Sequence, residues 1–368
     1  MKNVILILPT YNEKDNVETL IGAIEGVFQK LTKYKLTILV VDDYSPDGTA
    51  KTVENLSKKY KNIILISKEK EGLGAAYIFG MRYALKHLQP DIFIQMDADW
   101  QHNPLLLPEF LRAFERGADF VIGSRYIRGG SIPGNWGLHR KIYSIIGNSV
   151  VRFGLGMLLP HDWTSGYRLI KKEVIEDIAG GLEKYSGYTF QVASLHRIKM
   201  AGYKVAEVPQ QFADRVHGRS KIAPFDYIKN LLLYILNNST FLKYLVIGVI
   251  GFSVQTIIAK VLVQFINPGI AVVIGSFFAI CANFLGNNLW TFSHKRISGL
   301  AKLSQKFIHF LGTSIGAVII QGVVVGVGVW LWGRSAWFLL MIFAIVFLVI
   351  PYNYFVYNKF IWKGSKNV

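Results

Sequence analysis

The chain has 368 residues, enough for two domains, and a formal net charge of +17 at pH 7. Its single cysteine, Cys281, excludes an internal disulfide and a zinc site built on several cysteines. The mean hydropathy is positive (+0.31) because apolar runs dominate the part after residue 240. No aromatic–basic nucleic-acid motif occurs, so we expect an anionic membrane face or a phosphate-bearing substrate as partner and no nucleic acid.

The first part of the chain alternates short apolar runs with amphipathic stretches. Strands are predicted at 4–10, 36–43, 63–68 and 91–96, and helices at 13–29, 49–60 and 74–88. One face of the first helix collects the apolar residues Val17, Leu20, Ile21, Ile24 and Val27. The alternation and the near-continuous apolar strands predict an α/β fold with a mostly parallel sheet covered by helices on both faces.

Polar clusters follow three of the predicted strands. They are PTYNE at 9–13, DDYS at 42–45 and DAD at 97–99. Ligands of parallel sheets bind beyond the carboxyl ends of the strands. We therefore expect these clusters to converge at one edge of the sheet and to form a site there.

Asp97, Asp99 and Gln101 are spaced i, i+2, i+4 and offer hard oxygen ligands. Such a set suits Mg²⁺ or Mn²⁺, which bind through few protein carboxylates plus substrate phosphates. The alternative is that Asp99 caps the helix that follows it. The acids at the other strand ends favour a cation, because clustered carboxylates are stabilised by a metal-bound nucleoside diphosphate.

The second part of the chain contains four apolar segments, at about 243–266, 269–291, 307–332 and 336–361. Each is long enough to cross a hydrocarbon core of about 30 Å, although buried helices of a large soluble domain would also be apolar. The connection 293–306 carries four Lys or Arg residues, whereas the other two connections carry only Arg334. The positive-inside rule then places 293–306 and both termini in the cytoplasm.

An N-terminal location in the cytoplasm is also expected because the short apolar run at 4–8 is followed directly by Pro9 and polar residues, unlike a signal peptide. The apolar segments repeat: 283–292 resembles 353–362, and 241–251 resembles 307–317. Two helical hairpins would give this pattern. The amphipathic stretch 224–238 is predicted to be an interfacial helix.

Seven motifs follow one another in the order of a known family. They are PTYNE (9–13), VVDDYSPDGT (40–49), KEGLGAAYIFGMRYA (70–84), MDADWQHNP (96–104), IGSRY (122–126), SGYRLIKKEV (165–174) and DRVHGRSKI (214–222). They resemble family 2 glycosyltransferases of the GT-A fold, specifically dolichol-phosphate (polyprenyl-phosphate) mannose synthases, over residues 3–225. The part after residue 240 resembles a GtrA-like module of four transmembrane helices.

The resemblance implies roles for individual residues. The nucleotide would contact Pro9, Tyr11, Glu13, Val41 and Asp43. The metal and the sugar diphosphate would contact Asp97, Ala98, Asp99 and Gln101. The acceptor phosphate would face Arg125, Arg140 and Ser165, and a loop carrying Arg215 and Lys221 would neutralise phosphate charge. Asp99, Arg125 and Arg215 are the expected catalytic residues.

Two departures from the family pattern stand near the expected site. The chain reads Phe190-Gln191-Val192-Ala193 where the family commonly has a Glu after its FQ pair, and Trp163 replaces a smaller residue. Neither change touches the metal segment. His102 and His161 are near the site, but a phosphate acceptor needs no general base.

The resemblance implies a membrane enzyme that transfers mannose from GDP-mannose to dolichyl or polyprenyl phosphate, with inversion, using Mg²⁺ or Mn²⁺. The domains would be a GT-A domain at 1–223, an interfacial helix at 224–240 and a membrane domain at 241–368. A glucosyl or N-acetylhexosaminyl transferase using a UDP-sugar is the nearest alternative. A transferase fused to a translocator of lipid-linked sugars is another, and the sequence leaves the oligomeric state open.

Overall fold

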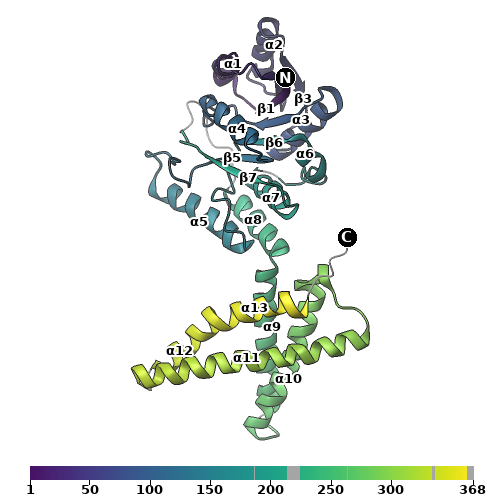
Figure 1. The fold of residues 1–368 in the computed structure, drawn as a ribbon, viewed down its shortest axis with the longest axis vertical. Coiled ribbons are helices and arrows are strands. Elements are labelled where there is room, and N and C mark those ends of the chain that lie inside the picture. The colour runs from purple at the N-terminus through teal and green to yellow at the C-terminus, as the bar shows by residue number, and fades with distance from the viewer. Residues whose placement is uncertain (186, 214–223, 263, 334–335, 363–368) are drawn as a thin grey trace. The chain divides into compact units, whose positions relative to one another are not determined.

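The computed structural model describes the whole chain except residues 186, 214–223, 263, 334–335 and 363–368. It divides into two compact units, Met1–Ile235 and Leu236–Val368 (Figure 1). The border lies inside the helix that the sequence predicts to be interfacial, so the predicted three-part division stays a prediction. Each unit has its own architecture.

The first unit is built on a seven-stranded sheet in its described part, with the order β3-β2-β1-β4-β6-β5-β7. The strands are β1 (Lys2–Thr10), β2 (Tyr34–Asp42), β3 (Ile63–Ser67), β4 (Ile92–Gln95), β5 (Phe120–Ser124), β6 (Arg168–Lys171) and β7 (Val205–Pro209). β1 to β4 pair in parallel, and β6 is antiparallel to both of its neighbours, β4 and β5. The predicted mostly parallel α/β fold is confirmed.

Helices and one helical turn connect the strands, and several of these helices pack on the sheet. They are α1 (Lys14–Phe28), α2 (Thr49–Lys59), α3 (Leu73–His87), the 3-10 turn η1 (Pro104–Leu106), α4 (Leu107–Glu115), α5 (Leu138–Gly154), α6 (Lys172–Ile178), α7 (Gly187–Met200) and α8 (Pro224–Asn238). The four strands and three helices predicted for residues 4–96 are all present, with small shifts at their ends. The five apolar residues predicted to share one face of α1 are all buried.

The core lies between the sheet and its helices. The five central residues of β1, Val4 to Leu8, are at most 1% exposed because helices cover both faces. Gly80 lets α3 approach the sheet closely, since a Cβ there would lie 2.9 Å from Val41 Cγ2 and 3.0 Å from Ile7 Cγ2. Helix α3 is thereby held against the two strands whose ends carry the first two polar clusters.

The second unit is helical. Its elements are α9 (Thr240–Leu262), α10 (Pro268–Gly286), η2 (Asn287–Thr291), η3 (Ser293–Lys295), α11 (Leu300–Trp332), α12 (Trp337–Phe343), η5 (Ala344–Val349), α13 (Ile350–Val356) and η6 (Tyr357–Ile361). Among the described residues, three helical stretches are long and apolar enough to cross a membrane: Thr240–Leu262, Leu300–Trp332 and Ala344–Ile361. Because α10 occupies the remaining predicted range, a count of four spans stays a prediction.

The two hairpins of this unit share an irregularity. In the predicted repeat, residues 283–292 correspond to 353–362, and both stretches contain a π-helix, Asn287–Thr291 and Tyr357–Ile361. The corresponding residues Phe292 and Trp362 stack on each other with ring centroids 4.7 Å apart. An irregular helical turn at the same place in both halves supports the predicted duplication.

Candidate active site

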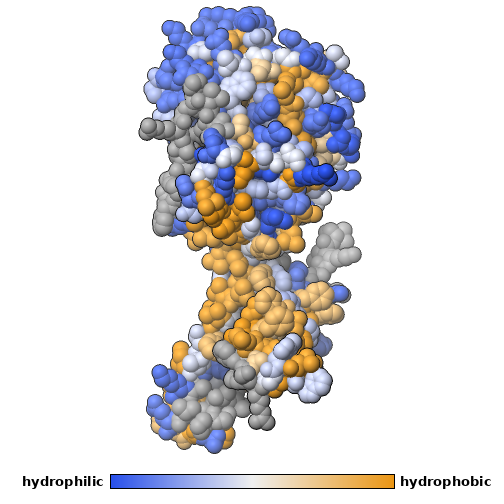
Figure 2. All heavy atoms as spheres, turned by 90° about the vertical axis from the view of Figure 1, so that its left-hand side faces the viewer, coloured by the Kyte–Doolittle hydropathy of each residue, from blue (hydrophilic) through white to orange (hydrophobic). Residues whose placement is uncertain are grey.

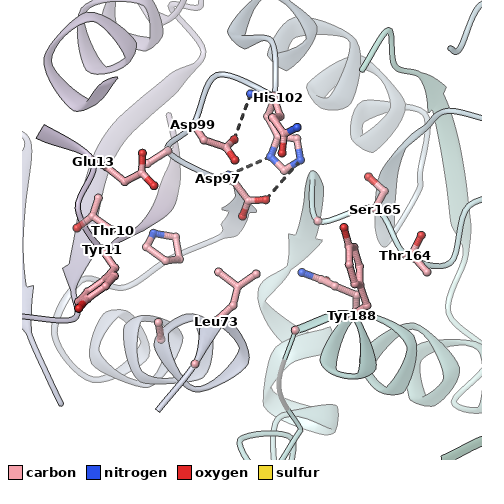
Figure 3. A pocket seen from close by; sticks show the side chains of 18 of the residues that line it. Thr10, Tyr11, Glu13, Leu73, Asp97, Asp99, His102, Thr164, Ser165 and Tyr188 are labelled. Atoms are coloured by element: carbon pink, nitrogen blue, oxygen red, sulfur yellow. Dashed lines mark hydrogen bonds and ion pairs between the residues drawn. The ribbon is translucent and has the colours of Figure 1, made fainter. Parts of the chain in front are cut away.

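A cavity of about 420 Å³ lies at the carboxyl ends of the strands. The ends of β1, β2, β4 and β5 contribute to it, together with the segment before β6 and the first turn of α7. Figure 3 shows Asp97 and Asp99 near its centre, Glu13 and Tyr11 on one side, and Ser165, Thr164 and Tyr188 on the other. The predicted convergence of the three polar clusters is confirmed.

The structure places most of the predicted site residues in this cavity. Its lining includes Pro9, Tyr11, Glu13, Asp43, Asp97, Ala98, Asp99, Gln101, Arg125 and Ser165. Val41 is fully buried inside the sheet, so any contact with a nucleotide must come from its backbone. Arg140 belongs to α5, with its guanidinium carbon 3.8 Å from the centroid of the Trp136 ring. Arg215 and Lys221 lie outside the described residues.

The chain turns sharply where each of the three clusters follows its strand. Asn12, Tyr44 and Trp100 have φ angles of 58°, 50° and 65°, in the left-handed region that residues other than glycine rarely adopt. Such backbone conformations persist only where the surrounding structure holds them, and they are frequent at active sites. The turns keep each cluster at the rim of the sheet instead of letting the strand continue.

Asp97 is positioned by two buried aromatic residues. The Tyr77 hydroxyl donates to Asp97 Oδ1 at 2.9 Å, and the Asp97 backbone N–H donates to His102 Nδ1 at 2.9 Å. Burial lowers the pKa of His102 to about 4, so its ring is neutral at pH 7. With Nδ1 accepting a hydrogen bond, the ring proton is on Nε2, which faces Asp97 Oδ2 at 3.8 Å (Figure 3). His102 therefore orients Asp97 and is not available as a base.

The alternative role of Asp99 as a helix cap is wrong. The helical turn η1 is capped by Asn103, whose Oδ1 accepts a hydrogen bond from the Leu105 N–H at 3.0 Å. The Asp99 carboxylate instead accepts from the Gln101 N–H at 3.2 Å and lines the cavity. Both carboxylates of the DAD segment are thus turned to the same space.

The donor set fits a divalent cation whose coordination a substrate completes. Within the described residues, no group of three or more His, Cys, Asp or Glu side chains could hold a metal alone. However, Asp97, Asp99 and Gln101 supply oxygen ligands at one wall of the cavity. Mg²⁺ and Mn²⁺ take such ligands and fill their remaining positions with phosphate oxygens and water.

Asp43 offers a second polar contact at the end of β2. Its Oδ1 is buried and has no hydrogen-bond partner in the part of the chain that the structure describes. Burial raises the pKa of Asp43, nearby Asp42 adds to the rise, and Lys68 opposes it. A buried carboxylate oxygen without a donor is costly, so this position suits a ligand that brings hydroxyl or N–H groups.

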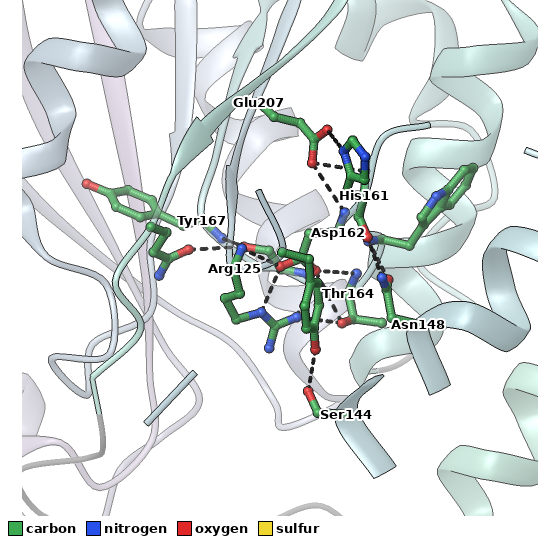
Figure 4. Close-up of polar contacts among 12 residues, drawn as sticks. Arg125, Ser144, Asn148, His161, Asp162, Thr164, Tyr167 and Glu207 are labelled. Atoms are coloured by element: carbon green, nitrogen blue, oxygen red, sulfur yellow. Dashed lines mark hydrogen bonds and ion pairs between the residues drawn. The ribbon is translucent and has the colours of Figure 1, made fainter. Parts of the chain in front are cut away.

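Arg125 is held by a buried ion pair (Figure 4). Its Nε and Nη2 donate to the two carboxylate oxygens of Asp162 at 2.7 Å each, and Nη2 also donates to Thr164 Oγ1 at 2.6 Å. Burial alone would raise the pKa of Asp162, but Arg125 lowers it, so the pair is charged. Arg125 therefore reaches the cavity with a fixed orientation and a charge that Asp162 largely compensates.

Glu207 on β7 holds the segment that carries Asp162. Its carboxylate accepts hydrogen bonds from the His161 N–H at 2.9 Å and the Asp162 N–H at 3.3 Å, and it also contacts His161 Nδ1 at 2.8 Å (Figure 4). His161 thus has a structural partner outside the cavity lining. No sequence motif indicates a role for Asp162 or Glu207, because that role depends on residues far away in the sequence.

Comparison with known proteins agrees with this geometry. Residues 5–179 match Glycosyl transferase family 2, and residues 243–362 match GtrA/DPMS, transmembrane domain. The Dolichol-phosphate mannosyltransferase of Pyrococcus furiosus is 33% identical over 324 residues, which cover 86% of this chain and 88% of that protein. The chain belongs to the dolichol-phosphate mannosyltransferase family.

Two further relatives of this glycosyltransferase match over a shorter stretch. The Polyprenol monophosphomannose synthase of Mycolicibacterium smegmatis is 37% identical over 224 residues, 60% of this chain and 82% of that protein. The Undecaprenyl-phosphate mannosyltransferase of Micrococcus luteus is 37% identical over 221 residues, 60% of this chain and 87% of that protein. The matched transmembrane domain and the three apolar helices identify this family member as a membrane protein.

Proposed function

We propose that this protein transfers mannose from GDP-mannose to a polyprenyl phosphate at the cytoplasmic face of the membrane, with inversion at the anomeric carbon. The observation that carries the proposal is that one cavity combines the strand-end carboxylates Asp97 and Asp99 with Arg125. The first group suits a sugar diphosphate with its cation, and the second suits a phosphate acceptor. The three relatives described above are all named for mannosyl transfer or mannose attachment to such lipids.

The donor half of the site is assigned to the strand ends of β1, β2 and β4. Tyr11, Glu13 and Asp43 would bind the nucleoside, and Asp97, Asp99 and Gln101 would hold Mg²⁺ or Mn²⁺. When bound, the cation supplies Lewis-acid neutralisation of the diphosphate. The side chains contribute by fixing the donor, since Tyr77 and His102 restrict Asp97 to one orientation.

The acceptor half is assigned to Arg125 and the segment Thr164–Ser165. A phosphate monoester is ionised at pH 7, so its oxygen can attack the anomeric carbon without a general base. The attack forms one carbon–oxygen bond while the bond to the diphosphate breaks and its electron pair leaves with GDP. A single displacement from an α-linked donor gives a β-linked product. Arg125 would orient the acceptor, with Arg140, Arg215 and Lys221 adding positive charge.

A lipid acceptor also explains an apolar surface on the first unit. Along its described length, helix α5 has only three buried residues, Asn148, Val151 and Gly154. More than half of the surface is exposed in each of its apolar residues Leu138, Tyr143, Ile146 and Phe153. Apolar side chains gather on the face that Figure 2 presents, next to hydrophilic ones. An exposed apolar helix face with basic residues suits a membrane interface. The basic connection 293–306 supports a cytoplasmic orientation.

The donor preference and the metal assignment can be tested with purified protein. With polyprenyl phosphate and Mn²⁺, the wild type should consume GDP-mannose much faster than UDP-glucose. Asp99→Ala should lower transfer at least about a hundredfold because the cation loses a ligand, while the thermal unfolding midpoint stays unchanged. Leu105→Ala, at an exposed position near the same turn, is the matched control and should keep wild-type activity.

Preference for UDP-glucose would assign the protein to glucosyl transfer instead. Undiminished turnover of Asp99→Ala with Mn²⁺ would show that this carboxylate is not a metal ligand.

A further inference from the structure

Gln191 is buried at the wall of the cavity with an unpaired amide. Its side chain is 2% exposed, and neither Nε2 nor Oε1 has a hydrogen-bond partner among the described residues. The nearby Gln210 is equally buried but bonded at both ends: its Nε2 donates to the Gln101 carbonyl, and its Oε1 accepts from Ser165. Buried amides are almost always paired, so the state of Gln191 needs an explanation.

The amide of Gln191 faces a space that exists because residue 166 is glycine. A Cβ on Gly166 would lie 3.3 Å from Gln191 Nε2, 3.4 Å from Asp97 Oδ2 and 3.5 Å from His102 Cε1. Groups from α7 and from the end of β4 therefore surround the position that a side chain on residue 166 would occupy. Figure 3 shows Asp97 and His102, two of these groups, together in the cavity. The space adjoins the carboxylate assigned to the donor's cation.

The backbone of Gln191 is fixed, whereas its amide is not. Arg168 Nη2 and Ser194 Oγ donate to the Gln191 carbonyl at 2.9 and 3.1 Å. The adjacent Phe190 ring stacks on Tyr77 with centroids 6.2 Å apart. The last torsion of a glutamine side chain is broad, so an amide without partners can turn towards a ligand at small cost.

We propose that Gln191 recognises two neighbouring hydroxyl groups of the sugar being transferred, and that Gly166 provides the space for them. This inference rests on the proposed function, because it assumes that Asp97 and Asp99 hold a sugar diphosphate. An amide offers an acceptor and two donors, which a pair of adjacent hydroxyls satisfies in full. A phosphate would not suit this corner, because the Asp97 carboxylate lies beside the amide and would repel it.

The test replaces the amide without changing the length of the side chain. In Gln191→Met, the ratio of the affinities for GDP-mannose and GDP, measured by calorimetry with Mn²⁺, should fall at least about tenfold, and the affinity for GDP should stay within about twofold. The thermal unfolding midpoint should stay equal or rise, because the unpaired amide costs stability in the ligand-free protein.

Two further variants complete the design. Gln95→Met is the matched control, since Gln95 is 1% exposed with an unpaired Oε1 but is not among the residues that line the cavity. It should keep the wild-type affinity ratio. Gly166→Ala fills the space at contacts of 3.3 to 3.5 Å, so it should lower the same ratio while the protein still folds and binds GDP.

Donors lacking one hydroxyl identify the contact directly. For the wild type, kcat/KM should fall about tenfold or more when the donor lacks either one of two hydroxyls on adjacent carbons. For Gln191→Met, removing either of these two hydroxyls should cause no further fall in kcat/KM. A wild-type affinity ratio in Gln191→Met, or a lower unfolding midpoint with an unchanged ratio, would overturn the proposal and leave Gln191 a packing role.

Donor binding by the wild-type protein tests the proposed function separately from the role of Gln191. If wild type prefers a UDP-sugar, the proposed donor is wrong, and the same ratio taken with that donor and UDP still decides the role of Gln191. If wild type binds GDP-mannose no differently from GDP and binds no UDP-sugar, both proposals fall.

Discussion

Adjacent acids at the end of β2 illustrate how single residues with the same chemistry take different roles. Asp42 accepts hydrogen bonds from the Thr10 hydroxyl at 2.8 Å and from the Ser45 N–H at 2.7 Å, so it fixes the turn after the strand. Asp43, the next residue, lines the cavity with one oxygen unpaired among the described residues. Successive side chains of a strand point to opposite faces, which separates a structural carboxylate from one available to a ligand.

The ion pair of Arg125 and Asp162 gives a prediction at the residue scale. Asp162→Asn keeps the size of the side chain but leaves Arg125 buried without a counter-charge, which should lower the free energy of unfolding by about 3–5 kcal/mol. Transfer should also fall at least about tenfold, because Arg125 loses its orientation. Thermal and denaturant unfolding, together with transfer assays, provide the measurements.

An exposed ion pair is the control for this prediction. Arg82 and Glu183 form a pair whose side chains are 55% and 43% exposed, so Glu183→Gln should change stability by less than about 1 kcal/mol. Because Arg125 lowers the pKa of Asp162, the stabilisation by the buried pair is present above the unfolded pKa of about 4 and is lost as the pH falls through the lower folded value. If Asp162→Asn and Glu183→Gln lowered the free energy of unfolding equally, the buried ion pair would not be the special contribution that we infer.

At the scale of elements, helix α8 has one face that is buried and another that is exposed. Its residues Leu231, Tyr234 and Ile235 are buried, whereas Leu232 and Leu233 on the other side are about half exposed. The His196 ring on α7 contacts the Tyr234 hydroxyl at 2.9 Å, and the Tyr185 ring packs on Tyr234 edge to face. The predicted helix is present, its interfacial position stays a prediction, and one of its faces packs within the catalytic unit.

His196 makes the attachment of α8 dependent on pH. Burial lowers the pKa of His196 to about 4, and the neighbouring Arg197 adds to the shift, whereas an ordinary histidine has a pKa of about 6.5. The unfolded chain therefore binds a proton that the folded protein does not, and stability is lost as the pH falls from about 6.5 to about 4.

His196→Gln removes this titration and keeps a hydrogen-bonding group for Tyr234. Between pH 6.5 and 4, its thermal unfolding midpoint should fall less steeply than that of the wild type. His87→Gln, at an exposed position in the last turn of α3, should keep the wild-type slope. Identical slopes for His196→Gln and wild type would remove the proposed link between α8 and pH.

At the scale of the whole molecule, the helical unit behaves as two copies of one hairpin. In the repeat, Tyr244 corresponds to Phe310 and Phe284 corresponds to Tyr354. Tyr244 contacts Tyr354 with ring centroids 5.7 Å apart, and Phe310 contacts Phe284 at 5.4 Å. Each hairpin thus uses its first helix to contact the second helix of the other at equivalent positions, as the two halves of a symmetric dimer do.

The division into two units predicts that the first binds the nucleotide and that the second anchors the protein in the membrane. The cavity is lined by residues of the first unit, which has its own sheet and core. A chain that ends after Asn238 should therefore fold and bind GDP with Mn²⁺ as the full chain does. Its transfer to polyprenyl phosphate should be similar in detergent and much lower in vesicles, because the helices that anchor it are missing.

Calorimetry and transfer assays in detergent and in vesicles compare the two chains. The control is the full chain in the same detergent. Loss of GDP binding in the shortened chain, with its circular dichroism unchanged, would show that the helical unit contributes to the nucleotide site.

The sequence alone determined the strands and helices of residues 4–96, the acids at the strand ends, the apolar segments and their duplication, because these follow from local periodicity and from motifs of adjacent residues. It did not predict α5 or the insertion of the antiparallel strand β6 between β4 and β5. Only the tertiary structure decided that Asp162 holds Arg125, 37 positions away, and that Gln191 and Asp97 meet across Gly166. Such contacts join residues that are distant along the chain, and they depend on how whole elements pack.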